Sequence, residues 1–248
     1  MKYIILILVS FLLSTCCVCE DDYMLRCEGL SESIEYNPET INRKVLVIGI
    51  DGIRSDAMQD SISPFLFELS QQENTYFTDS HITERITYSG PNWSSLLTGV
   101  HMSKHNVLEN EFLNPNFDEY PSFFYYLENI EEPINTVSIV NWLPIHTHIL
   151  SNVVDHAPSE SISDLEVFNS CKEILLNNNP VEGDVIFLHF DELDAAGHGY
   201  GFSADVEEYR TTLTTIDGYT EGLFNIIESK RANGEDWIVF IVSDHGGD

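Results

Sequence analysis

Four runs of apolar residues, many of them β-branched, divide the chain beyond residue 43. Residues 44–50, 185–190 and 237–242 are apolar over nearly their whole length, and residues 136–140 form a weaker fourth run. These runs lack the alternation of polar and apolar residues that marks a half-exposed strand. The pattern therefore predicts parallel strands that are buried on both faces.

Helical periodicity and helix start signals occupy the segments between these strands. Ser63 followed by Pro64 marks the start of one helix, and Ser163 with Glu166 forms a capping box for another. Ser203 is expected to open a long helix with one continuous apolar face. Because strands and helices alternate, the predicted fold class is α/β, a three-layer α/β/α arrangement with a mostly parallel central sheet.

The first 42 residues differ from the rest of the chain. Residues 1–19 are typical of a secretory signal peptide, because Lys2 is followed by an apolar run and then by small residues before Glu20. The run is too short to span a bilayer, so no transmembrane segment is expected in the mature chain. We therefore predict a secreted or extracytoplasmic protein, with a lipoprotein anchor at Cys16 as the alternative. Residues 20–42 are polar and acidic, which indicates an arm or linker.

The charge balance makes one large class of partner unfavourable. With 11 Lys and Arg against 41 Asp and Glu, the formal net charge is −30, so no nucleic-acid-binding surface is expected. A small anionic substrate would also be repelled at long range. A site for a small phosphorylated substrate therefore needs local positive charge, which bound metal cations can supply.

Acidic and histidine residues follow three of the four predicted strands. Asp51 comes directly after the first strand, Asp194 and His198 follow the third, and Asp244 and His245 follow the fourth. In parallel sheets, ligands bind beyond the carboxyl ends of the strands. Carboxylate oxygens and neutral imidazole nitrogens are typical ligands of Zn²⁺. Each pair alone also fits an ordinary turn or a surface polar group, but three such groups in order favour a metal centre.

A serine before a predicted helix is the candidate nucleophile. Pro91 is expected to be the first helical residue and Gly99 to end the helix, which places Ser89 just before the helix N-terminus. Free N–H groups and the helix dipole favour an anion such as a phosphoryl group at this position. The alternative is that Ser89 is only part of a helix cap. A serine hydroxyl is a poor nucleophile unless its pKa is lowered, which a coordinated metal ion would do.

Four motifs, taken in order, resemble the alkaline phosphatase superfamily, in particular its type I phosphodiesterase and nucleotide pyrophosphatase branch. Their sequences are Val-Ile-Gly-Ile-Asp-Gly-Ile-Arg, Ser-Gly-Pro-Asn leading to Leu-Thr-Gly, Asp-Ala-Ala-Gly-His and Ser-Asp-His-Gly-Gly. They lie at residues 47–54, 89–99, 194–198 and 243–247. The resemblance covers roughly residues 44–248 and implies an alkaline phosphatase-like, metal-dependent phosphoesterase domain over residues 43–248.

This resemblance implies a two-metal hydrolase of phosphate esters. It implies two divalent cations, most simply zinc, and a covalent phosphoserine formed at Ser89. The implied ligands of one ion are Asp51, Ser89, Asp244 and His245, and those of the other are Asp194 and His198.

Two further residues near Ser89 carry predictions. Asn92 matches a position whose amide holds a non-bridging phosphate oxygen in the family, and Thr87 is the second choice as nucleophile. Asn92 also begins the sequon Asn92-Trp93-Ser94, the only one in the chain. Because a glycan would block the site, we predict that Asn92 is unmodified.

The sequence departs from the family in one respect. The second ion of the family takes a further histidine from beyond the Asp-His-Gly motif, and the sequence ends at Asp248. Three interpretations stay open. The C-terminal part of the domain is missing from this sequence, the second ion is held weakly, or the protein is an inactive relative that acts as a metal- or phosphate-binding module. The substrate is open among phosphate monoesters, diesters, pyrophosphates and phosphonates.

Overall fold

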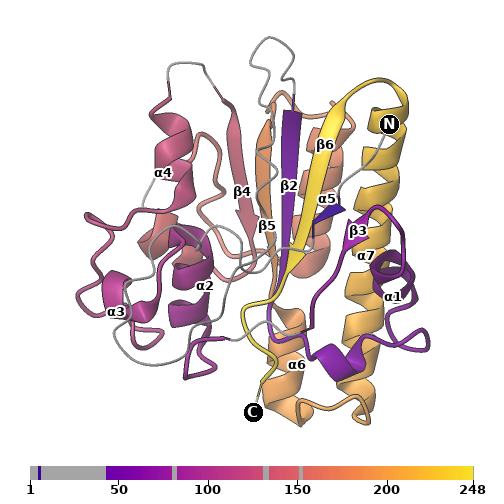
Figure 1. Cartoon of the computed structure of the whole chain (residues 1–248), viewed down its shortest axis with the longest axis horizontal. Helices are drawn as coiled ribbons and strands as arrows, with labels where there is room; N and C mark the ends of the chain where they lie inside the picture. Colours follow the sequence, from indigo (N-terminus) through magenta and orange to yellow (C-terminus); the bar gives the residue numbers. More distant parts are fainter. Residues whose placement is uncertain (1–4, 7–42, 80–82, 131–133, 151–152, 248) are drawn as a thin grey trace, which may run out of the picture.

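Four parallel strands in the order β4-β5-β2-β6 form the centre of the molecule (Figure 1). The computed structural model describes residues 5–6, 43–79, 83–130, 134–150 and 153–247. The strands are β2 (Arg43–Ile50), β4 (Thr136–Val140), β5 (Val185–Phe190) and β6 (Asp236–Val242). All four predicted strands are confirmed, each to within one residue at either end.

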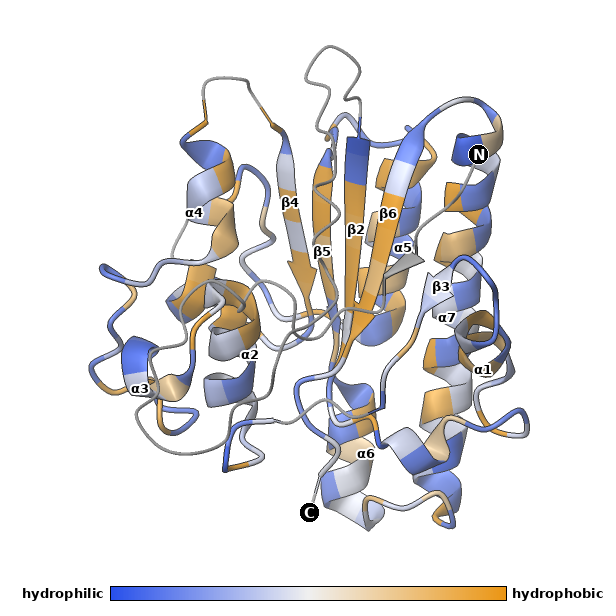
Figure 2. Cartoon of the chain, viewed as in Figure 1, coloured by the Kyte–Doolittle hydropathy of each residue, from blue (hydrophilic) through white to orange (hydrophobic). Residues whose placement is uncertain are grey.

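Helices cover both faces of this sheet. One face carries α2 (Ser89–Thr98), α4 (Phe123–Glu128) and a π-helix (Ile145–Leu150). The other carries α1 (Pro64–Ser70), α5 (Asp164–Leu175) and α7 (Glu207–Ala232). Figure 2 shows the apolar strands between two layers of helices of mixed hydropathy. The predicted three-layer α/β/α fold with a mostly parallel sheet is confirmed.

Alternate residues of β2 belong to two separate cores. Leu46, Ile48 and Ile50 pack in the core shared with α1, α5 and α7, while Val45 and Val47 pack against the core shared with α2. Every residue of β4 and β5 is buried. Burial on both faces explains why these strands show no polar alternation.

Short elements connect the layers. They are a 3-10 helix (Ser55–Ala57), β3 (Thr75–Tyr76), α3 (Met102–His105) and α6 (Glu192–Tyr200). β1 (Ile5–Leu6) pairs with β3 in a second, two-stranded parallel sheet. Apart from β1, the predicted signal peptide and acidic arm lie outside the described residues and stay predictions. Within the part of the chain that the structure describes, no helix is both long enough and apolar enough to cross a membrane.

The helix start signals are mostly confirmed. The capping box between Ser163 and Glu166 is present at the start of α5, and Pro64 is the first residue of α1. The predicted start of α7 is wrong, because the helix begins at Glu207 instead of next to Ser203. Ser203 closes a turn of its own, in which its carbonyl and hydroxyl oxygens accept hydrogen bonds from the two N–H groups before the helix.

Gly197 lies inside α6, where the absence of a side chain permits close packing. A Cβ added at Gly197 would come within 2.3 Å of the ring of Phe202, whereas one at Gly199 would meet nothing within 4 Å. The two glycines of this helix therefore differ sharply in their surroundings.

We expect Gly197→Ala to lower the free energy of unfolding by about 1 to 3 kcal/mol, because the ring of Phe202 must move aside. Gly199→Ala is the matched control. It should leave stability unchanged or raise it by up to about 1 kcal/mol, since alanine favours a helix over glycine. Urea denaturation measures both variants, and equal stability of the two would contradict the close contact at Gly197.

Candidate metal centre

The carboxyl ends of neighbouring strands bring the predicted ligands together. β5, β2 and β6 lie side by side, so the residues that follow them meet at one edge of the sheet (Figure 1). Asp51 follows β2, Asp244 and His245 follow β6, and Asp194 lies in the first turn of α6. Gly52 turns the chain after Asp51 with a φ of 72°, a left-handed conformation that suits glycine.

One ring nitrogen of His245 lies among the carboxylates. Its Nε2 is 3.3 Å from Asp51 Oδ1, 3.4 Å from Asp244 Oδ2 and 3.9 Å from Asp194 Oδ1. Asp51 is fully buried, and Asp244 and His245 are nearly so. Asp51, Asp194 and His245 each offer one ligand atom, and these atoms lie within 4.8 Å of one another.

Three carboxylate oxygens of this cluster are buried without a hydrogen-bond partner. They are Asp51 Oδ1, Asp194 Oδ1 and Asp244 Oδ2, the same oxygens that approach His245. An unsatisfied buried acceptor costs roughly 1 to 3 kcal/mol, and more when it is charged. A divalent cation among these atoms would satisfy all three, and the oxygen and nitrogen donors suit Zn²⁺. The residues present therefore fit a metal ion.

The pKa values of the cluster reflect the cost of placing these acids together. Burial raises the pKa of Asp244 well above its ordinary value, and the charge of Asp51 raises it further. Burial and the Asp51 charge raise the pKa of Asp194 to about 6. Burial also acts to raise the Asp51 pKa, but the hydrogen bond and charge of His189, together with the charge of His245 and the hydrogen bond of Trp93, hold that pKa below its ordinary value. A bound cation would displace the protons that the metal-free cluster retains.

Ser89 lies at the edge of this cluster. It is the first residue of α2, so the helix begins two residues earlier than the predicted start at Pro91. The Ser89 Oγ lies 3.4 Å from Nε2 of His245. The carboxylates approach the same nitrogen, whereas a Ser-His-Asp triad needs its carboxylate on the opposite ring nitrogen. Thr87, the second choice, precedes the helix by two residues.

The N–H groups at the start of α2 are partly used within the protein. Gly90 N–H donates to Asn110 Oδ1 at 2.7 Å, and Asn92 N–H donates to Tyr88 O at 3.3 Å. Pro91, between them, has no N–H to offer. An anion at this helix end would therefore rely on the helix dipole and on displacement of the Asn110 side chain.

The side chain of Asn92 fixes the loop before α2. Asn92 is 3% exposed, and its Oδ1 accepts from Glu84 N at 2.9 Å. Its Nδ2 donates to Ile86 O at 2.8 Å and to Tyr88 O at 2.9 Å. Both amide hydrogens are used, so contact with a phosphate oxygen would require Asn92 to give one of them up. The phosphate contact of Asn92 stays a prediction.

His198 occupies the exposed side of the cluster. Its side chain is 72% exposed, and its Nε2 lies 3.4 Å from Asp194 Oδ2. The other oxygen of Asp194 faces His245. Asp194 thus connects the two ligand groups that the resemblance implies, and the six predicted ligands form one continuous cluster. The division of these ligands between two ions stays a prediction.

Two residues that the sequence did not assign to the site bond to Asp51. Its Oδ2 accepts from Trp93 Nε1 at 2.8 Å and lies 3.1 Å from Nε2 of His189. In the sequence, Trp93 lies on the inner face of a helix and His189 lies in an apolar strand, so both look like core residues. The one indication in the sequence was a histidine within an apolar strand, because a fully buried imidazole needs a hydrogen-bond partner.

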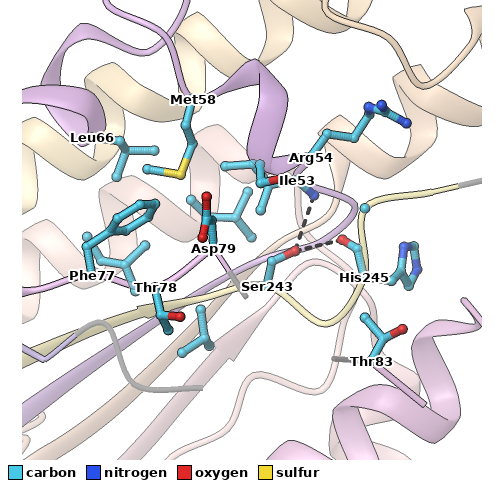
Figure 3. A pocket seen from close by; sticks show the side chains of 15 residues that line it. Ile53, Arg54, Met58, Leu66, Phe77, Thr78, Asp79, Thr83, Ser243 and His245 are labelled. Atoms are coloured by element: carbon cyan, nitrogen blue, oxygen red, sulfur yellow. Dashed lines mark hydrogen bonds between the residues drawn. The ribbon is translucent and has the colours of Figure 1, made fainter. Parts of the chain in front are cut away.

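A cavity of about 200 Å³ lies beside the loop that carries His245 (Figure 3). Its walls are largely apolar and include Met58 and Phe77. Ser243 ties this loop to the one after β2, because its hydroxyl accepts from Ile53 N at 3.2 Å and donates to His245 O at 2.8 Å. Figure 3 shows the His245 ring extending away from Met58 and Phe77. The cavity therefore borders the backbone of the loop that carries His245.

A cluster of acids and histidine at the carboxyl edge of a parallel sheet, with a serine hydroxyl beside it, defines a candidate centre of the metal-dependent hydrolase class. The family model for type I phosphodiesterase / nucleotide pyrophosphatase matches residues 45–130 and 141–248. The chain therefore belongs to this family, which confirms the resemblance seen in its motifs.

The curated relatives that match are about twice as long as this chain. Bis(5'-adenosyl)-triphosphatase ENPP4 of Bos taurus is 26% identical over 250 residues, which cover 90% of this chain and 52% of that protein. The Homo sapiens protein of the same name is 25% identical over 229 residues, covering 82% of this chain and 47% of its own. The chain thus spans about half the length of these relatives.

Solved structures show the same fold. An inactive variant of murine ectonucleotide pyrophosphatase / phosphodiesterase 5, in complex with AMP, is similar with a TM-score of 0.64 at 17% identity, covering 82% of this chain and 57% of that one. A second murine structure of that protein has a TM-score of 0.60 at 19% identity, with the same coverage. At these identities the likeness concerns the fold alone, and it confirms the predicted alkaline phosphatase-like architecture.

Burial of Asn92 generates a prediction about its sequon. The side chain is 3% exposed and both of its amide hydrogens are used, so the fold has no room for a glycan on Asn92. Peptide mass spectrometry of chain secreted from eukaryotic cells should find Asn92 unmodified. High glycan occupancy at this residue would contradict the geometry described for the loop.

Removing one charge from the cluster should have opposite effects without and with metal. In metal-free protein, Asp244→Asn should raise the free energy of unfolding by about 1 kcal/mol or more, because the variant no longer buries an acid whose pKa is raised by burial and by the charge of Asp51. With Zn²⁺ added, the same variant should show a smaller metal-dependent rise in Tm than the wild type, because a ligand is lost.

Thermal unfolding in EDTA and in Zn²⁺ measures both effects. Asp236→Asn, an exposed acid at the other end of β6, is the matched control and should change stability by less than about 0.5 kcal/mol in either condition. A rise in Tm on addition of Zn²⁺ that is as large in Asp244→Asn as in the wild type would argue against a metal centre at this cluster.

Proposed function

We propose that this chain hydrolyses phosphate esters, with Ser89 as the nucleophile. The observation that carries the proposal is the convergence of three unpartnered, buried carboxylate oxygens and the Ser89 hydroxyl on one nitrogen of His245. Membership of the type I phosphodiesterase / nucleotide pyrophosphatase family supports the same reaction class.

The cluster is proposed to hold two divalent cations, of which Zn²⁺ suits the donors best. Bound there, such ions would lower the pKa of a coordinated hydroxyl and offset the charge of the phosphate group. The proposed ligands are Asp51, Ser89, Asp244 and His245 for one ion, and Asp194 and His198 for the other. The chain itself carries a net charge of −30, so its own side chains offer few positive groups to a phosphate.

In the proposed reaction, Ser89 Oγ attacks phosphorus, forms an Oγ–P bond and displaces the leaving oxygen. The serine proton passes to solvent and the leaving oxygen takes one up, so the first half yields a free alcohol or phosphate and a phosphate ester of Ser89, which keeps the second ester group when the substrate is a diester. Water then attacks this ester of Ser89, breaks the Oγ–P bond and restores the hydroxyl. The place of Ser89 at the start of α2 directs the positive end of the helix dipole at the phosphoryl group.

Asn92 and the Gly90 N–H are proposed to contact the phosphoryl oxygens. For this purpose Asn92 Nδ2 would exchange its bond to Tyr88 O, and Gly90 N–H would exchange its bond to Asn110. Each exchange replaces one internal hydrogen bond by one to a charged acceptor, and hydrogen bonds to charged acceptors are the stronger ones.

Phosphodiester and pyrophosphate bonds of nucleotides are the proposed substrate class. The relatives are named bis(5'-adenosyl)-triphosphatases, and one similar structure contains AMP. These properties belong to those proteins, and they support the assignment of the same chemistry to this chain. The proposed place of action is outside the cytoplasm, which rests on the signal peptide predicted at residues 1–19.

The alternative is a metal- or phosphate-binding module without turnover. Two observations favour it. His198 is largely exposed, and the amide of Asn92 and the N–H of Gly90 are used inside the protein, which would leave a phosphate held by few donors. The two functions differ in one measurable quantity, the turnover of a phosphate ester in the presence of Zn²⁺.

Ser89→Ala is expected to abolish hydrolysis. With Zn²⁺ present, kcat for bis(p-nitrophenyl) phosphate or a dinucleoside polyphosphate should fall by roughly a thousandfold or more, because no covalent intermediate can form. Thr87→Ala should keep most of the activity and is the matched control. Mass spectrometry of acid-quenched wild-type protein should find on Ser89 the part of the substrate that stays on phosphorus, a p-nitrophenyl phosphoryl group or a nucleotidyl group.

Other outcomes would change the assignment. Zn²⁺ binding by the wild-type chain without turnover of any phosphate ester would favour the binding module. Loss of activity in Thr87→Ala together with full activity in Ser89→Ala would transfer the role of nucleophile to Thr87.

A further inference from the structure

The two carboxylate oxygens of Asp51 have different surroundings. Oδ2 lies 2.8 Å from Trp93 Nε1 and 3.1 Å from His189 Nε2. Oδ1 has no hydrogen-bond partner and lies 3.3 Å from Nε2 of His245. Asp51, Trp93 and His189 are all completely buried, so water does not compete for either oxygen. One oxygen is therefore bonded within the protein and the other faces the cluster.

The direction of both hydrogen bonds follows from the groups involved. An ionised carboxylate only accepts, and an indole N–H only donates. Nε2 of His189 must therefore carry the hydrogen that it shares with Asp51. Two N–H groups thus point at Oδ2, which leaves this oxygen few lone-pair positions for any further partner.

The packing around Trp93 holds its N–H on Asp51. The indole lies against Gly49 of β2, where an added Cβ would come within 2.5 Å of the ring. It also meets the rings of His189 and Phe187 edge-on, with ring centroids 4.9 and 5.9 Å apart. Since β2 and β5 are paired strands, His189 keeps a constant position relative to Asp51, and the contacts of the indole with both strands hold Trp93 beside it.

We propose that Trp93 and His189 are positioning residues that restrict Asp51 to one metal-binding oxygen, Oδ1, and thereby favour Zn²⁺ over Ca²⁺. Zn²⁺ takes about four ligands, whereas Ca²⁺ takes six to eight oxygens and often binds both oxygens of one carboxylate. With Oδ2 bonded to two N–H groups, Asp51 cannot bind in this second way. The inference rests on the proposed function, because it requires a metal ion at the cluster.

The test compares metal affinities of the full chain and its variants after EDTA treatment, by calorimetric titration with ZnCl₂ and with CaCl₂. Trp93→Phe and His189→Phe keep an aromatic ring and remove the N–H, while His189→Gln keeps an N–H donor. Trp237→Phe is the matched control for the tryptophan, because its indole N–H donates to the carboxylate of Glu235 at the opposite end of the sheet at 2.9 Å. His146→Phe is the control for a buried histidine.

The expected result is a loss of Zn²⁺ affinity of roughly tenfold or more in Trp93→Phe and in His189→Phe. The ratio of Zn²⁺ to Ca²⁺ affinity should fall as well, because Oδ2 becomes available to Ca²⁺. His189→Gln, Trp237→Phe and His146→Phe should keep the wild-type ratio. A change in this ratio distinguishes a positioning role from a general loss of structure, because a loss of structure would lower the affinity for both ions alike.

Two results would overturn the inference. One is a Zn²⁺ to Ca²⁺ ratio in Trp93→Phe and His189→Phe equal to that of the wild type, whether or not the absolute affinities fall. The other is an equal change of ratio in the two control variants. A wild-type chain that binds no Zn²⁺ would overturn both the proposed function and this inference. An unchanged ratio in a chain that does bind Zn²⁺ would overturn this inference alone.

Discussion

Three buried carboxylate oxygens without hydrogen-bond partners, gathered at one edge of a parallel sheet, are the constraint on which the rest of the structure depends. Burial and mutual repulsion raise the pKa values of Asp194 and Asp244, whereas the donors of Trp93 and His189 help to hold the pKa of Asp51 below its ordinary value. A bound cation would offset the cost of burying all three carboxylates. The atoms that destabilise the metal-free chain are thus the atoms proposed to bind metal, and folding and metal binding become linked.

The sheet supports this cluster by holding each loop from more than one side. β2 lies between β5 and β6, so Asp51 has loops with proposed metal ligands on both sides. The hydroxyl of Tyr209 in α7 donates to Gly52 O at 2.7 Å and accepts from Arg54 N at 3.0 Å, which fixes the turn after Asp51. Ser243 joins the same turn to the loop after β6. Sites supported in this way keep their geometry more precisely than sites on free loops.

The site has a buried half and an exposed half. Asp51 and Asp244 lie in the interior, His198 lies largely in solvent, and Ser89 lies between them at the start of α2. Packing among the described residues positions the buried half. In the exposed half, the hydrogen-bond donors that a phosphate would need are used within the protein. The amide of Asn92, for example, donates to the loop before α2. This division explains why turnover, more than metal binding, separates the proposed hydrolase from a binding module.

Local patterns along the chain were enough to predict the four strands and the side chains that follow them. Buried parallel strands are continuous apolar runs, and residues after such strands must meet at one edge of the sheet, so Asp51, Asp194, Asp244 and His245 were predictable as neighbours. The start of α7 was mispredicted, because a serine that closes a turn resembles a serine that caps a helix. The bonds from Trp93 and His189 to Asp51 join residues 42 and 138 positions apart. Only the packing of α2 and β5 against β2 brings these side chains together, and no local pattern encodes that packing.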